Sequence, residues 1–183
     1  MRLFVALALP DDVADGLLPL QHGVPGADWS EREQLHLTLR FIGEVDGLAA
    51  SAIDDALSAI AAPRFTLALK SVGEFGGKNP RALWAGVTDQ SAVVHLNRKI
   101  ETALQRVDQP AETRKFTPHV TLARLRAAPR GKVMDWLADH SLYASREFEV
   151  TDFTLYSSLL SAGGSIYTAE RVYPLQPKPG AEP

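Results

Sequence analysis

Two short stretches of the sequence each combine a histidine with a threonine two residues later. The first is HLTL, beginning at His36, and the second is HVTL, beginning at His119. Because side chains alternate between the two faces of a strand, His36 and Thr38 share one face, and so do His119 and Thr121. If both stretches are strands, each presents an imidazole and a hydroxyl together, while the intervening apolar residues face the core.

Such a set of side chains can carry out acid–base chemistry on a phosphodiester. An imidazole has an unperturbed pKa of about 6.5, so at neutral pH one histidine can act as a base and the other as an acid. Threonine hydroxyls can hydrogen-bond phosphoryl oxygens. The alternatives are a solvated strand face without function and a metal site. The spacing matches no standard zinc motif, and neither tetrapeptide contains Asp or Glu, so we expect neither a metal nor another cofactor.

The elements predicted around the two histidines occur twice in the same order. From the N-terminus the pattern reads strand, helix, strand, helix, strand, and from residue 81 it repeats with one additional strand. An offset of 83 residues relates His36 to His119 and also Phe65 to Phe148. The sequence therefore predicts an internal duplication.

The duplication predicts a single bilobal domain over residues 1–175, with lobes at about 1–75 and 80–175. If a pseudo-twofold axis relates the lobes, the two His–Thr pairs face each other across a cleft. The remaining residues, 176–183, include three prolines and are expected to form a disordered tail.

Strands are predicted from alternating or continuous apolar residues, and helices from apolar residues at helical spacing. In the strand at 35–42, regular alternation places Phe41 on the core face and Arg40 on the face of His36 and Thr38. The last two strands are expected to be joined at Gly163-Gly164. Strands are expected at 2–9, 35–42, 65–72, 81–87, 117–125, 147–157 and 165–174, and helices at 11–21, 48–61, 91–107 and 130–140.

Composition narrows the class of protein. The chain has 183 residues, 45% of them hydrophobic and 22% charged, with a formal charge of −3 and no cysteine. These values are typical of a globular domain and exclude disulfides and thiolate chemistry. No apolar run approaches the roughly 20 residues of a membrane span, and the N-terminus does not resemble a signal peptide. We therefore expect a soluble cytoplasmic protein that does not interact with membranes.

Within their flanking residues, the two His–Thr stretches resemble the 2H phosphoesterase superfamily. More narrowly, the chain resembles the RNA 2′,3′-cyclic phosphodiesterase family, historically called 2′-5′ RNA ligases. This resemblance implies an α+β fold in which two antiparallel sheets flank a central cleft and the helices lie outside. It covers about residues 2–175 and includes RLFVAL at 2–7, LHLTLRFIGEV at 35–45, RALWAGV at 81–87, TPHVTLAR at 117–124 and FTLYSS at 153–158.

The resemblance also implies an activity, the hydrolysis of a 2′,3′-cyclic phosphate at an RNA 3′ end to a 2′-phosphate without a metal. Carried over to this chain, His119 is the base that activates water, and His36 protonates the departing 3′ oxygen. Thr38 and Thr121 hold the phosphate oxygens.

The family pattern assigns two further residues to the substrate. Arg124 matches an arginine five positions after the second histidine. Regular alternation would place Arg124 on the opposite face from His119, so it reaches the phosphate only through a bulge or a strand end. Phe116 stands where the family can offer an aromatic ring near the base or ribose. Tyr167 is a candidate for the border of the cleft, and the other histidines, which lack a partner motif, are predicted to be surface or capping residues (His22, His95 and His140).

The predicted partners are RNA 3′ ends that carry a cyclic phosphate, or nucleotides, bound by a monomer. The negative total charge conceals a basic stretch beside the second motif, which can receive an RNA terminus. Three alternatives remain open: 2′-5′ RNA ligation, hydrolysis of a small cyclic nucleotide phosphate, and a non-catalytic module that binds RNA ends. The basic residues of this stretch are Arg114, Lys115, Arg124, Arg126, Arg130 and Lys132.

Overall fold

The fold is built on a strongly twisted antiparallel sheet, seen in a computed structural model that describes residues 1–161, 164–178 and 180. Within these residues the sheet has eight strands, in the order β10-β9-β1-β3-β7-β6-β5, and β2 also pairs with β7. A separate two-stranded sheet is formed by β4 and β8. The strands are β1 (Arg2–Ala8), β2 (Ala27–Trp29), β3 (His36–Glu44), β4 (Phe65–Leu67), β5 (Leu69–Phe75), β6 (Ala82–Val87), β7 (Val120–Leu125), β8 (Phe148–Val150), β9 (Asp152–Ser161) and β10 (Gly164–Pro174).

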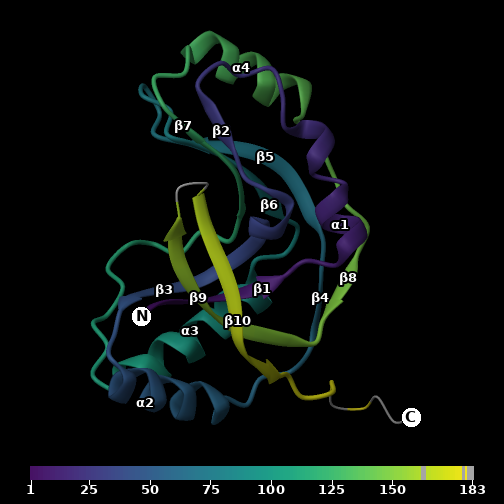
Figure 1. The fold of residues 1–183 in the computed structure, drawn as a ribbon. Helices are drawn as coiled ribbons and strands as arrows, with labels where there is room; N and C mark the ends of the chain where they lie inside the picture. The colour runs from purple at the N-terminus through teal and green to yellow at the C-terminus, as the bar shows by residue number, and fades with distance from the viewer. Residues whose placement is uncertain (162–163, 179, 181–183) are drawn as a thin grey trace.

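Helices lie outside the sheet, at both ends of the molecule and along one side (Figure 1). At one end α2 packs against α3, and α3 packs against β3, while α4 lies at the other end. The described part of the chain has no helix both long and apolar enough to cross a membrane. The helices are α1 (Asp11–Asp15), α2 (Gly47–Ser58), α3 (Ser91–Gln105) and α4 (Arg130–Asp139), with 3₁₀ turns η1 (Leu18–Leu20) and η2 (Arg32–Gln34).

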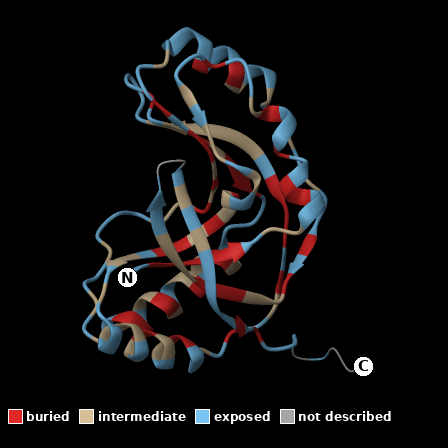
Figure 2. Ribbon diagram, viewed as in Figure 1, coloured by how far each residue is buried: buried red, intermediate tan, exposed pale blue. Residues whose placement is uncertain are grey.

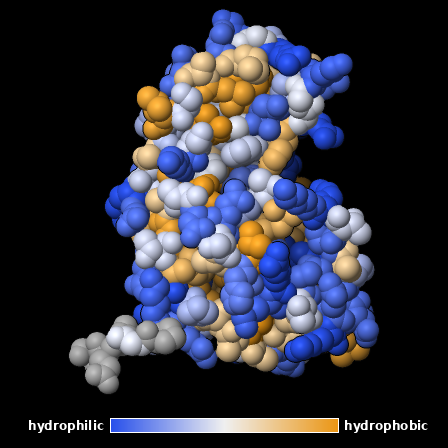
Figure 3. All heavy atoms as spheres, turned by 180° about the vertical axis from the view of Figure 1, so that it is seen from behind, coloured by the Kyte–Doolittle hydropathy of each residue, from blue (hydrophilic) through white to orange (hydrophobic). Residues whose placement is uncertain are grey.

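Apolar side chains fill the space between the sheet and these helices. Figure 2 shows buried residues along the central strands and on the inner sides of the helices. The rear face in Figure 3 is largely hydrophilic, with apolar residues gathered near its upper end. The core draws on nearly every element, which explains how a chain with 45% hydrophobic residues sustains this fold.

The predicted α+β class is confirmed, but the two expected sheets are two halves of one sheet. A single residue pair, Leu37 with Val120, joins β3 to β7 and connects the halves. Each half also combines strands from both repeats, so the repeats at about 1–75 and 80–175 do not form separate lobes. β9 and β10 extend the half that contains β1 and β3, whereas β5 pairs with β6. A repeat in the sequence identifies equivalent elements, but it does not determine which of them pair.

Some predicted boundaries are wrong because of prolines. The helix expected at 11–21 is replaced by α1 and η1, since Pro19 lacks the N–H that a continuous helix requires. The strand expected at 117–125 begins only at Val120, because Pro118 cannot donate to a neighbouring strand.

The predicted disordered tail does not begin at Gln176. The Gln176 N–H donates to the Ala62 carbonyl at 2.8 Å, and the Gln176 carbonyl accepts from the Arg64 N–H at 2.8 Å. These bonds attach the chain to the segment before β4. The part of the tail prediction that falls on residues 179 and 181–183 lies outside the described residues, as does Gly163 of the predicted turn.

A bulge in β3 overturns the regular alternation predicted for this strand. Ala6 of β1 pairs with Thr38, and the next residue, Val5, pairs with Arg40, which leaves Leu39 as the extra residue. Leu39 and Arg40 are consequently both buried, at 2% and 9% exposure, whereas Phe41 is 54% exposed. Arg40 therefore lies on the core side, and Phe41 joins the face of Thr38.

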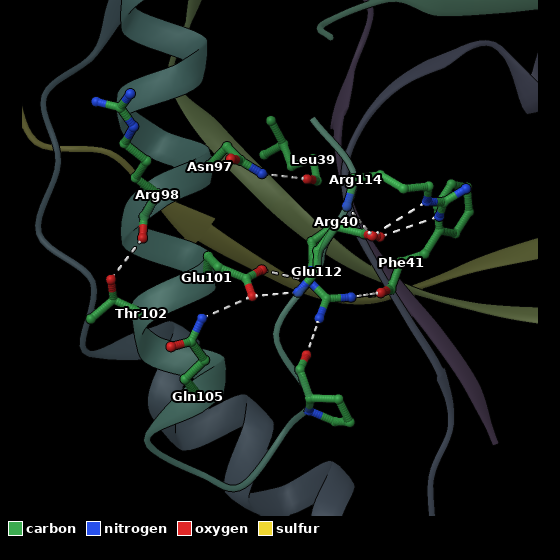
Figure 4. A network of polar contacts seen from close by, with 11 residues as sticks. Leu39, Arg40, Phe41, Asn97, Arg98, Glu101, Thr102, Gln105, Glu112 and Arg114 are labelled. Carbon is green, nitrogen blue, oxygen red and sulfur yellow. Dashed lines mark hydrogen bonds and ion pairs between the residues drawn. The ribbon is translucent and has the colours of Figure 1, made fainter. Parts of the chain in front are cut away.

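Arg40 occupies the centre of a buried polar network that joins three segments (Figure 4). Its Nε lies 2.6 Å from a carboxylate oxygen of Glu101 on α3. Its terminal nitrogens donate to the carbonyls of Phe41 and Pro110. Glu101 also accepts the backbone N–H of Glu112 at 2.9 Å. One arginine thus holds β3, α3 and the segment that leads to β7 together.

We expect Arg40→Ala to lower the free energy of unfolding by about 3 kcal/mol, because it leaves Glu101 and two carbonyls without their partner. Arg171→Ala is a matched control, since the Arg171 side chain is 57% exposed in its ion pair with Asp54 and such a pair is worth less than about 1 kcal/mol. Urea unfolding followed by tryptophan fluorescence measures both. An equal, small loss in the two variants would show that the Arg40 network does not hold the fold together.

Candidate active site

The single pairing between β3 and β7 brings the two His–Thr stretches together. Leu37 and Val120 are antiparallel partners, so the flanking residues on one face lie opposite each other in crossed order. His36 comes opposite Thr121, and Thr38 opposite His119. His36 and His119 are therefore diagonal neighbours. In a regular antiparallel ladder diagonal neighbours are roughly 7–8 Å apart, which leaves room for a phosphoryl group between the two imidazoles.

His36 is surrounded by aromatic rings from three strands. It stacks on Phe4 of β1 with ring centroids 5.0 Å apart, and Tyr167 of β10 meets it edge-on at 5.3 Å. Tyr156 of β9 lies 6.2 Å away in a stacked arrangement. The Nε2 atom of His36 lies 3.0 Å from Thr38 Oγ1. These contacts fix the ring orientation and keep the histidine and threonine of the first motif together.

His119 is held by a different set of aromatic residues. Phe75 of β5 meets its ring edge-on at 4.9 Å, and Trp84 of β6 lies 6.1 Å away. The Trp84 indole covers Gly73, where a Cβ atom would lie only 2.1 Å from the indole. Glycine at this position therefore allows the tryptophan to lie flat across the strand. His119 Nδ1 is 2.6 Å from the Thr117 carbonyl, so this nitrogen is occupied by the backbone.

Burial lowers the pKa of both histidines. For His36 burial brings the pKa to about 4; a hydrogen bond with the Gln34 backbone opposes this shift, and the charge of His119 adds to it. Burial also lowers the pKa of His119, against a hydrogen bond with the Thr117 backbone. Both imidazoles are therefore neutral in the unliganded protein at pH 7.

A groove of about 550 Å³ is lined by three of the four motif side chains, His36, Thr38 and Thr121. His119 is not among its lining residues. The end of β9 and the start of β10 form one wall of the groove, and Figure 1 shows these two strands side by side. The other lining residues are Asp28, Trp29, Ser30, Glu31, Gln34, Phe41, Arg124, Arg126, Leu160, Ser161, Gly164, Ser165 and Tyr167.

Arg124 reaches the groove because β7 contains a bulge. Leu83 of β6 pairs with Ala123 and the next residue, Trp84, pairs with Thr121, so Leu122 is the extra residue. Leu122 and Ala123 are both fully buried. The bulge changes the alternation and places Arg124 on the same face as Thr121. The sequence pattern required such a bulge for Arg124 to contact a phosphate.

The other predicted residues separate into two groups. Tyr167 lines the groove, whereas Phe116 is partly buried against the core and is not among the lining residues. His22 and His140 pack edge to face, 5.7 Å apart and away from the groove. His95 is exposed on α3.

Alternation concealed two groove residues from sequence reasoning. Phe41 was expected in the core and Arg126 was noted only as part of a basic stretch, yet both line the groove. Only the second motif carried a sequence signal for a bulge, the two consecutive apolar residues Leu122 and Ala123, whereas the first motif continues with Leu39 and Arg40. Among the described residues, no three His, Asp or Glu side chains come together as a potential metal site.

Comparisons with known proteins agree with the fold and with the sequence resemblance. Residues 9–161 match the family described as the 2′-5′ RNA ligase superfamily. The RNA 2′,3′-cyclic phosphodiesterase of Archaeoglobus fulgidus is 31% identical over 94% of this chain and 99% of its own length. That of Thermotoga maritima is 31% identical over 91% of each chain.

Solved structures give the same result. A crystal structure of a Thermus thermophilus protein has a TM-score of 0.81 and 27% identity, covering 97% of this chain and 100% of the other. The Escherichia coli LigT structure complexed with 3′-AMP has a TM-score of 0.78 and 25% identity, covering 95% and 97%. The resemblance recognised from the two His–Thr stretches is confirmed, and the chain belongs to the 2′-5′ RNA ligase superfamily.

Proposed function

We propose that this protein hydrolyses the 2′,3′-cyclic phosphate at an RNA 3′ end to a 2′-phosphate, without a metal. The observation that carries the proposal is the pairing of Leu37 with Val120, which places two imidazoles and two threonine hydroxyls on one face. The relatives named RNA 2′,3′-cyclic phosphodiesterase support the same activity.

The proposed reaction is a single in-line displacement. His119 takes a proton from water as the water oxygen forms a bond to phosphorus. The bond from phosphorus to the 3′ oxygen breaks, and His36 gives its proton to that oxygen. The products are a 3′-hydroxyl and a 2′-phosphate. Thr38 and Thr121 donate hydrogen bonds to the non-bridging oxygens, and Arg124 offsets their charge.

The low pKa values of the two histidines determine when His36 is protonated and can act as an acid. A base must be neutral, which burial ensures for His119. An acid must be charged, and burial opposes this for His36. A bound phosphate anion next to the imidazole favours its charged form. Substrate binding therefore supplies the charge that allows His36 to become protonated.

We expect His36→Ala and His119→Ala each to lower kcat about 10²–10⁴-fold, the usual size of a general acid or base contribution. The assay follows cleavage of an RNA that ends in a 2′,3′-cyclic phosphate, in the presence of EDTA. His95→Ala is the matched control, because His95 is exposed on α3 outside the groove.

Near-normal activity in both His36→Ala and His119→Ala would rule out the site. An RNA fragment with a 5′-hydroxyl, added to the same reaction, tests whether 2′-5′ joining competes with hydrolysis. If the wild-type protein binds the RNA but turns over no cyclic phosphate, a non-catalytic end-binding module replaces the proposal.

The free protein should show both imidazoles titrating below the ordinary value of about 6.5, with His36 near pH 4. Adding the 2′-phosphate product should raise the pKa of His36 toward neutrality. Histidine ring signals in NMR titrations measure both values, with His36→Asn and His119→Asn for assignment. If the product raises only the pKa of His119, the acid and base roles are exchanged.

A further inference from the structure

The groove continues past the His–Thr residues to a cationic end. Arg124 and Arg126 both line it beyond Thr121. A strand rises about 3.3 Å per residue, so the backbone of Arg126 lies roughly 15 Å beyond that of Thr121. A cyclic phosphate held by the two threonines is therefore out of reach of the Arg126 guanidinium, whereas a second phosphate farther along a chain can meet it.

Arg126 has no counter-charge in the described structure. Five other arginines form ion pairs with carboxylates, but no ion pair among the described residues includes Arg126. Its cross-strand neighbour is Gly26, whose carbonyl accepts the Arg126 N–H at 2.9 Å. A Cβ at Gly26 would lie 2.5 Å from the Arg126 carbonyl, so this neighbour must be a glycine and presents no side chain.

The two acidic residues in the groove lining, Asp28 and Glu31, each have another neighbour. Asp28 lies opposite Arg124 in the β2–β7 pair, so its cross-strand neighbour is Arg124 and not Arg126. The Glu31 carboxylate accepts the backbone N–H of Gln34 in a capping box at η2. Arg126 is thus exposed in the groove lining without a carboxylate partner among the described residues, and an exposed guanidinium favours a phosphate oxygen.

We propose that Arg126 binds the phosphodiester that precedes the terminal nucleotide, and so makes the site select an RNA chain end over a free cyclic mononucleotide. The inference rests on the proposed function, because the position of the cyclic phosphate at the His–Thr residues defines the distance to Arg126. It adds a second phosphate subsite and a minimum substrate length of two nucleotides for full efficiency.

The test compares adenosine 2′,3′-cyclic phosphate with a triadenylate that ends in a 2′,3′-cyclic phosphate. The wild-type protein should favour the triadenylate in kcat/KM by about tenfold, the size of one hydrogen bond to a charged group, and Arg126→Ala should abolish this preference. Arg98→Ala removes the same charge from the exposed face of α3 and should keep the preference. The salt dependence of triadenylate binding should also lose about one unit of slope in Arg126→Ala.

The outcomes separate the two proposals. Equal efficiency on both substrates in the wild type, or an equal preference in Arg126→Ala and Arg98→Ala, would overturn the subsite while leaving the hydrolytic function intact. Failure to turn over either substrate would overturn the function instead. In that case calorimetry tests the subsite through the affinities of the mononucleotide and trinucleotide 2′-phosphate products. The subsite requires the wild-type protein to bind the longer product about tenfold more tightly, and Arg126→Ala to lose this preference.

Discussion

The site depends on one antiparallel residue pair, Leu37 with Val120. These residues are 83 positions apart, the same offset that relates the two repeats, so the pair lies on the local pseudo-twofold axis. A histidine and a threonine on each side of this axis then necessarily share one face in crossed order. A shift of one residue in this pairing would bring equivalent residues out of register and turn side chains to opposite faces. Both residues are fully buried, which holds the register in place.

The two strands also have equivalent bulges, but the side chains that follow the bulges differ in chemistry. The extra residues are Leu39 in β3 and Leu122 in β7, again 83 positions apart. Each bulge turns the strand so that the second residue after the extra leucine lines the groove: Phe41 on one side and Arg124 on the other. Duplicated backbone geometry therefore gives one end of the groove an aromatic ring and the other end a guanidinium. An asymmetric ligand has a defined direction in such a groove.

The sequence was sufficient to predict the family, the α+β class and the placement of His36 and Thr38 on one face. Strand alternation and the internal repeat can both be recognised from the order of the residues alone. It was insufficient where a single extra residue changes the alternation. Arg40 was expected beside His36, yet it is buried against Glu101, and Phe41 was expected in the core. The mixing of strands from both repeats in each half of the sheet was also hidden, since it depends on long-range pairing. Arg126 could be noted only as one of several basic residues, because its lack of a counter-charge is a property of the fold.

The packing that positions the two histidines also disfavours their protonated form, and this effect is compatible with the proposed reaction. Rings such as Phe4 and Tyr167 fix the orientation of His36 but remove water from it, which lowers its pKa to about 4. An acid that stayed charged in the empty groove would require a counter-ion there, and that ion would have to leave before the phosphate binds. Here no such ion is needed, because the imidazole is neutral until an anion arrives. In the proposed reaction, the phosphate that is cleaved is therefore also the group that favours the protonated, acidic form of His36.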